Sequence, residues 1–172
     1  MKIRAVFNVI HFISAILASI FLAFQLVIIS TNVIMRYFFA SGISWMEEIS
    51  KDVLMTAFTF LSMAIGVKLD LHINVNIIPK QAPSWVTPAL LKLKYLILAV
   101  IGFVFLYFGT SLLFMIKARI ASIPILPAAL QFVAIPLAGL LILYESITSL
   151  LGIEKDDTYL DRKFMSVGEK GD

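Results

Sequence analysis

The chain has 172 residues, of which 60% are hydrophobic and 15% charged, with a net charge of +3 and no cysteine. Soluble domains contain about 45–50% apolar and about 25% charged residues, so this composition excludes a soluble globular enzyme and a disordered chain; the lack of cysteine excludes disulfides, thiolate metal sites and cysteine nucleophiles. The positive charge includes no basic run interleaved with aromatic residues, which indicates no nucleic-acid binding and is typical of basic residues at the cytoplasmic ends of membrane helices.

The apolar segments are long enough to cross a bilayer. A spanning helix needs about 20 apolar residues, because the hydrocarbon core is about 30 Å thick and each residue rises about 1.5 Å. Helices are therefore predicted at about 6–35, 45–67, 92–116 and 127–151. The first segment is about twice as long as the apolar part of a signal peptide and is read as a retained helix. The prediction is an all-α integral membrane protein, with one four-helix membrane domain over 1–152 and a polar cytoplasmic tail over 153–172.

Polar residues lie near the end of the first predicted helix. Asn32 and Arg36 are four residues apart and share one face. They could form a polar seam against another helix or subunit, and Arg36 could pair with an acid of the next helix. Alternatively, Arg36 simply interacts favourably with the carboxyl end of its own helix.

The start of the second predicted helix holds the densest charge cluster. Ser44 and Glu47 fit a capping box, in which each side chain bonds an unpaired backbone N–H. Glu47 and Lys51 have the spacing of an ion pair, and Glu48 with Asp52 forms an acidic ridge. Paired carboxylates could serve proton or cation chemistry, but helix capping and docking of a partner explain the cluster equally simply.

The connection between the second and third predicted helices combines apolar and polar residues. Ile73, Val75 and Ile77 alternate with asparagines, and Trp85 follows. This mixture predicts an interfacial segment at the level of the lipid headgroups, anchored by Trp85. His72 lies just before it and is interpreted as a hydrogen-bonded interfacial residue.

The fourth predicted helix contains an internal proline and one acid. Pro127 can open it, and Pro136 is expected to bend it by removing a hydrogen bond. Glu145 lies near its inner end, where it is expected to reach water. Neither Glu145 nor His11 has a sequence partner that would complete a catalytic set, and the chain has no Walker loop, HExxH, GxSxG or dinucleotide fingerprint. An enzyme is therefore not expected.

The distribution of basic residues predicts the orientation. Ten of the fourteen Lys and Arg residues fall on the side of the two termini and the connection between the second and third helices. The positive-inside rule therefore places both termini in the cytoplasm. The segments 36–46 and 117–126 then face the opposite side.

Several of these residues, in this order, resemble a known family. They are Arg36-Tyr37-Phe38-Phe39, Ser44-Trp45-Met46-Glu47-Glu48, Gly66, His72-Ile73 and Pro136. Over residues 1–152 the chain resembles the small membrane subunit (DctQ-like, or Q subunit) of tripartite ATP-independent periplasmic (TRAP) transporters. Each motif is short, and their order and spacing carry the resemblance. His72 and Pro136 count here as family-motif residues.

The resemblance implies a function and partners. Such a subunit lies in the bacterial inner membrane and supports a large multi-spanning subunit, while a periplasmic substrate-binding protein delivers an organic acid of the sialic acid or C4-dicarboxylate class. Sodium is expected in the partner subunit, and no cofactor in this chain. Candidate interface residues are Arg36, Tyr37, Trp45, Glu47 and Glu48, and Trp85 would contact membrane lipids. Two alternatives remain, a stand-alone channel or small exporter, and an intramembrane enzyme using Glu47, Glu48 and His72, which the predicted topology places on opposite sides.

Overall fold

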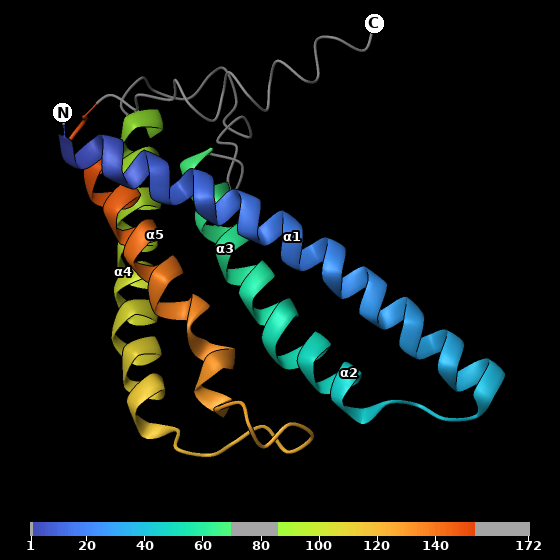
Figure 1. Cartoon of the computed structure of the whole chain (residues 1–172). Coiled ribbons are helices and arrows are strands. Elements are labelled where there is room, and N and C mark those ends of the chain that lie inside the picture. Colours follow the sequence, from blue (N-terminus) through green and yellow to red (C-terminus); the bar gives the residue numbers. More distant parts are fainter. Residues whose placement is uncertain (1, 70–85, 154–172) are drawn as a thin grey trace, which may run out of the picture.

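The computed structural model describes residues 2–69 and 86–153 (Figure 1). Apart from one isolated bridge between Arg119 and Pro127, the ordered elements of this part of the chain are helices. Four helical stretches are long and apolar enough to cross a membrane: Val6–Phe39, Ser44–Lys68, Pro88–Met115 and Ala128–Leu150. The predicted all-α membrane fold with four spanning helices is confirmed. The expected interfacial segment, with His72 and Trp85, and the tail from 154 onward lie outside the described residues.

The described part of the chain contains seven helical elements. They are α1 (Lys2–Phe39), α2 (Ser44–Glu48), the π-helix η1 (Ile49–Leu54), α3 (Met55–Lys68), α4 (Val86–Met115), the 3₁₀ helix η3 (Ala128–Phe132) and α5 (Ala134–Leu150). The elements α2, η1 and α3 together form the second span. In space, α3 packs between α1 and α5, and α4 packs mainly on α5. The long helix α1 runs obliquely past the others (Figure 1).

Glycines allow α4 and α5 to approach closely. A Cβ atom at Gly139 would lie 2.5 Å from the backbone nitrogen of Leu106, and one at Gly102 would lie 2.7 Å from that of Leu143. Backbone atoms of a packed helix cannot move aside, so these positions exclude a side chain. Beside this contact, Leu141 is fully buried in the core between α3, α4 and α5.

The fourth span is interrupted just before Pro136. Pro136 was expected to bend a continuous helix over 127–151. Instead η3 ends at Phe132 and α5 begins at Ala134, which places Pro136 in the first turn of α5. Proline has no N–H to bond the carbonyl four residues earlier, which is that of Phe132, and η3 ends at this residue. The position of the interruption therefore agrees with the predicted disruption of the fourth span by Pro136. Its ring packs on α4, where a Cβ atom at Gly109 would lie 2.9 Å from the Pro136 Cδ.

Helix α4 begins earlier than expected. It starts at Val86, before the expected boundary at residue 92. Lys92 and Lys94 end the apolar run, but lysine is a good helix former, so they do not end the helix.

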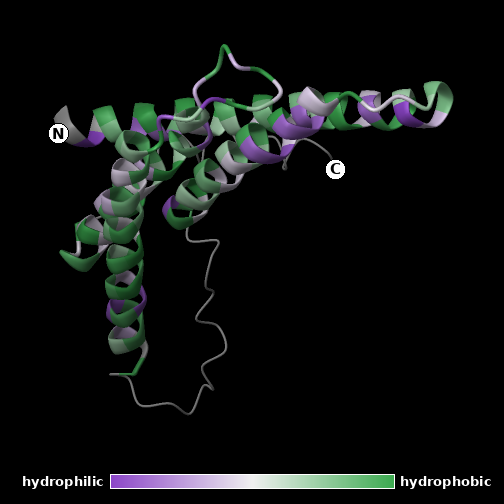
Figure 2. Cartoon of the chain, turned by 90° about the horizontal axis from the view of Figure 1, so that it is seen from below, coloured by the Kyte–Doolittle hydropathy of each residue, from purple (hydrophilic) through white to green (hydrophobic). Residues whose placement is uncertain are grey.

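The bundle has two ends of different composition. The start of α1, the end of α3, the start of α4 and the end of α5 lie together, and we call this the terminal end (Figure 1). The loops 40–43 and 116–127 lie at the opposite end, which we call the loop end. Between the ends, α1 and α4 carry long apolar stretches, as the hydropathy colours of Figure 2 show.

Candidate functional site: two polar ends of the bundle

At the loop end, Asn32 joins α1 to α2. Its Oδ1 accepts a hydrogen bond of 2.9 Å from the backbone N–H of Ile43, the residue that precedes α2. No side chain caps α2, so the expected capping box of Ser44 and Glu47 is wrong. Ser44 is already the first helical residue, whereas a capping side chain must precede the helix.

Glu48 holds a loop that is distant in sequence. Its Oε1 accepts a hydrogen bond of 3.2 Å from the Ala121 N–H, and its Oε2 accepts one of 2.9 Å from the Ser122 N–H and another from the Ser122 hydroxyl. These bonds tie the end of α2 to the loop between α4 and η3. The Glu48 carboxylate therefore binds this loop, and among the described residues it forms no ion pair with Arg36, the partner that the sequence suggested.

Glu47 forms the predicted pair with Lys51. The Lys51 Nζ lies 2.6 Å from the Glu47 Oε1, which confirms the pairing expected from the spacing. The two side chains remain 57% (Glu47) and 66% (Lys51) exposed, so the pair contributes little to stability. It remains open to a partner or to solvent.

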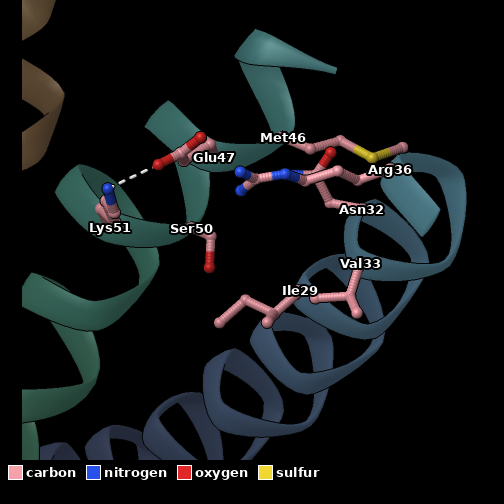
Figure 3. A pocket seen from close by; sticks show the side chains of 8 residues that line it. All are labelled: Ile29, Asn32, Val33, Arg36, Met46, Glu47, Ser50 and Lys51. Atoms are coloured by element: carbon pink, nitrogen blue, oxygen red, sulfur yellow. Dashed lines mark hydrogen bonds and ion pairs between the residues drawn. The ribbon is translucent and has the colours of Figure 1, made fainter. Parts of the chain in front are cut away.

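Arg36 lines a pocket whose wall also contains the acid Glu47. Among residues 2–69 and 86–153 its guanidinium forms no ion pair with a carboxylate. The pocket has a volume of about 220 Å³ and lies between α1 and the α2–η1 segment (Figure 3). Its lining residues are Ile29, Asn32, Val33, Arg36, Met46, Glu47, Ser50 and Lys51.

Aromatic side chains surround this end. Tyr37 is 83% exposed, and Phe38, Phe39 and Trp45 are exposed as well. Exposed aromatic residues at helix ends are typical of the boundary between the bilayer and water. Tyr37 and Trp45 thus present contact surface and are absent from the lining of the pocket.

At the terminal end, four polar side chains from three helices meet in the interior. Lys68 of α3 lies with its Nζ 3.4 Å from the Glu145 Oε1 of α5, and it donates a hydrogen bond to the Asn8 Oδ1 of α1. The Nε2 of His11 is 3.7 Å from the same carboxylate oxygen, and its Nδ1 donates to the Phe7 carbonyl at 2.9 Å. We call Asn8, His11, Lys68 and Glu145 the polar cluster.

Burial of this cluster corrects a prediction. Glu145 was expected to reach water, yet only 5% of it is exposed, against 4% of Lys68 and none of His11. The last turns of α5 are covered by α1 and α3, so the carboxylate needs a charged partner from another helix. The sequence analysis missed the cluster because its members are far apart in the chain. The one available signal was the high cost of an ionisable residue within a spanning segment.

The remaining residues that the sequence analysis singled out belong to neither polar end of the bundle as described. His72 and Trp85 lie outside the described residues, and Pro136 packs against α4. Within the described part of the chain, no group of three or more His, Asp or Glu residues could hold a metal ion. The arrangement there is one of structural ties and contact surfaces.

Comparison with known proteins agrees with this picture. The family described as "Tripartite ATP-independent periplasmic transporters, DctQ component" matches residues 25–155. A protein of Haemophilus influenzae that is named as a TRAP transporter small permease is 30% identical over 145 residues, which cover 82% of this chain and 89% of the relative. The matched region contains the loop end and most of the four spans. The chain therefore belongs to the DctQ component family of the tripartite ATP-independent periplasmic transporters.

Proposed function

We propose that the chain is the small scaffold and anchor subunit of a sodium-coupled TRAP transporter. In this role it holds a large multi-spanning subunit in the inner membrane, while a periplasmic binding protein delivers an organic acid, such as sialic acid or a C4-dicarboxylate. Membership of the family supports a transport component with partner subunits. Sodium, substrate and any catalytic step are assigned to the partners, and this subunit acts neither as an enzyme nor as a cofactor protein.

The observation that carries the proposal is the exposed apolar surface of α1 and α4. Phe24 and Val27 on α1 are 56% and 62% exposed, and Phe103 and Tyr107 on α4 are 58% and 59% exposed. Each helix has its main contacts on one side only, α1 with the second span and α4 with α5 and η3. These faces can contact lipid on one side of the bundle and helices of a larger subunit on the other.

A scaffold must also keep its shape while its partner moves. The polar cluster ties α1, α3 and α5 together at the terminal end, and the glycine contacts fix α4 on α5. The buried charges of Lys68 and Glu145 are paired in this arrangement of the helices, which favours it over arrangements that would separate them. Both features favour the role of a rigid scaffold for this subunit over that of a moving carrier.

The proposed orientation places both termini in the cytoplasm. Arg4, Lys68 and Lys94 lie at the terminal end. Only four of the fourteen Lys and Arg residues of the sequence fall on the side of the loop end. The loop end would then face the periplasm, where Arg36, Tyr37, Trp45 and Glu47 are candidates for contact with the large subunit or the binding protein. In this scheme Glu48 acts indirectly by holding the loop at Ser122, and His72 and Trp85 contact the membrane interface.

The test is purification of the tagged full chain from its native membrane in mild detergent, with identification of the proteins that accompany it. A large polytopic subunit in stoichiometric amount is expected, and its binding protein would then identify the substrate. A homo-oligomer that carries flux alone in liposomes would overturn the proposal in favour of a stand-alone channel or exporter.

Paired variants locate the docking face. Phe24→Ala with Val27→Ala removes apolar contact from α1, and Phe103→Ala with Tyr107→Ala removes it from α4. These side chains are exposed, so the stability of the isolated chain should change little. Loss of the large subunit from one variant and not the other identifies its docking helix; retention by both contradicts docking through these faces.

A further inference from the structure

The pocket at the loop end has an unused hydrogen-bonding group in its wall. Ser50 is 1% exposed, and its Oγ has no hydrogen-bond partner among the described residues. Its hydroxyl points from η1 into the space between η1 and α1 (Figure 3). A buried polar atom without a partner costs free energy, so its presence in the wall of a pocket points to a ligand that pairs with it.

The local helix geometry at this point is unusual. Ser50 and Lys51 belong to η1, a π-helical turn between the α-helical elements α2 and α3. Such turns are rare and are often found at functional sites.

The charge of the pocket favours an anion. The wall holds two positive side chains, Arg36 and Lys51, and one negative side chain, Glu47. Glu47 bonds Lys51 and interacts with Arg36 only through their charges. The pocket therefore carries an excess positive charge beside a hydroxyl donor. A guanidinium is suited to bind a phosphate or carboxylate through two parallel hydrogen bonds.

The rest of the wall and its surroundings indicate a lipid. Ile29, Val33 and Met46 provide an apolar side to the pocket. The exposed Tyr37 and Trp45 place it at the level of the lipid headgroups. Its volume of about 220 Å³ is below the roughly 300–1,000 Å³ of sites for drug-sized ligands and is sufficient for a phosphate group.

We infer that this pocket binds the phosphate group of a membrane phospholipid. The Arg36 guanidinium and the Ser50 hydroxyl donate hydrogen bonds to the phosphate oxygens, and Ile29 and Val33 contact the beginning of the acyl chains. The bound lipid would fill the gap between α1 and η1 where the second span starts. This inference concerns a lipid site of the chain itself and does not depend on the substrate proposed above.

The test is native mass spectrometry of the purified full chain, with any subunit that accompanies it, after removal of endogenous lipid. The probes are phosphatidylglycerol, diacylglycerol with the same acyl chains, and inorganic phosphate. We expect the phospholipid to bind at least about tenfold more tightly than the diacylglycerol, because only the phospholipid offers the charged acceptor. Inorganic phosphate alone should not bind, because it lacks the apolar contacts.

Variants distinguish binding of the phospholipid in the pocket from a general attraction of the phospholipid to positive charge at the loop end. Arg36→Gln should weaken phospholipid binding about tenfold and Ser50→Ala a few-fold, while Arg36→Lys should keep part of the binding. Lys117→Gln removes a positive charge from an exposed residue at the same end, outside the pocket, and serves as the matched control. A thermal melt of each variant shows that the fold is retained.

Four outcomes would overturn the inference, three of which concern the ligand and one a protein partner. The first three are equal binding of diacylglycerol and phospholipid, equal loss of binding in Arg36→Gln and Lys117→Gln, and displacement of the phospholipid by inorganic phosphate. The fourth is an Arg36→Gln chain that keeps its phospholipid but loses a protein partner, which would assign the pocket to an acidic side chain of that partner. Each of these is distinguishable from failure of the transporter proposal, which is judged by the accompanying proteins.

Discussion

The two ends of the bundle handle charge in opposite ways. At the terminal end, Lys68 and Glu145 are almost completely buried, and they pair across helices that are adjacent in space. At the loop end, Glu47 and Lys51 pair within one helix and stay exposed, and Arg36 faces a pocket. Charge inside a bundle is tolerated when another helix supplies the partner, whereas charge at an exposed end is free to contact another molecule. The terminal end therefore holds the fold, and the loop end is the better place for binding.

The largest effect on stability is expected when one charge of the buried Lys68–Glu145 pair is removed. Lys68→Met should lower the free energy of unfolding by about 3–5 kcal/mol, because it leaves the Glu145 carboxylate buried without its cation. The measurement is a denaturant titration in mixed micelles. Adding Glu145→Leu should recover a large part of the loss. At the loop end, Lys51→Met should have no measurable effect on stability; an equal loss from the two methionine variants would contradict the division between the ends.

Replacing a glycine by alanine should lower the free energy of unfolding in the bundle interior and change it little at the loop end. Gly139→Ala places a methyl group against the backbone of α4 and should cost about 1–3 kcal/mol of unfolding free energy. In Gly42→Ala the new Cβ meets only the Asn32 Oδ1, at 4.0 Å, so the change should be within about 0.5 kcal/mol. The same titration compares them, and similar costs would argue against tight contact between α4 and α5.

The loop end also contains a site where stability can be gained. Ala40 follows α1 with a φ of 49°, in the left-handed region that favours glycine. Ala40→Gly should raise the unfolding free energy by about 1 kcal/mol, since it removes the steric cost of the Cβ atom. Ala18→Gly, inside α1 and in its core contact, should have the opposite sign. A decrease for Ala40→Gly would show that this backbone conformation is not maintained.

The smallest global effect is expected at Glu48, where the response should be local. Glu48→Gln weakens the bonds that hold the Ala121 and Ser122 amides, so their hydrogen exchange should accelerate several-fold while the overall melting temperature stays nearly constant. Glu47→Gln changes the neighbouring carboxylate, which bonds Lys51 instead, and should leave both amides unaffected. Equal hydrogen-exchange rates of these amides in the two variants would show that Glu48 does not hold this loop.

Local patterns were sufficient for part of the molecule. Hydropathy predicts the four spans because a bilayer requires about 20 consecutive apolar residues, and the order of short motifs points to the family that the comparisons confirm. The Glu47–Lys51 pair follows from helical spacing alone. These features depend on residues that are neighbours in the chain.

The remaining features depend on which helices become neighbours in space. Asn32 bonds the residue that precedes α2, Glu48 bonds a loop 74 residues away, and Glu145 is buried against Lys68. Such pairings cannot be predicted from spacing along the chain, because they form only when apolar helix faces pack and bring distant polar groups together. Hydropathy and local spacing thus set the number of helices and their local pairs, and the packing of those helices decides which polar groups are buried and which remain available for a ligand.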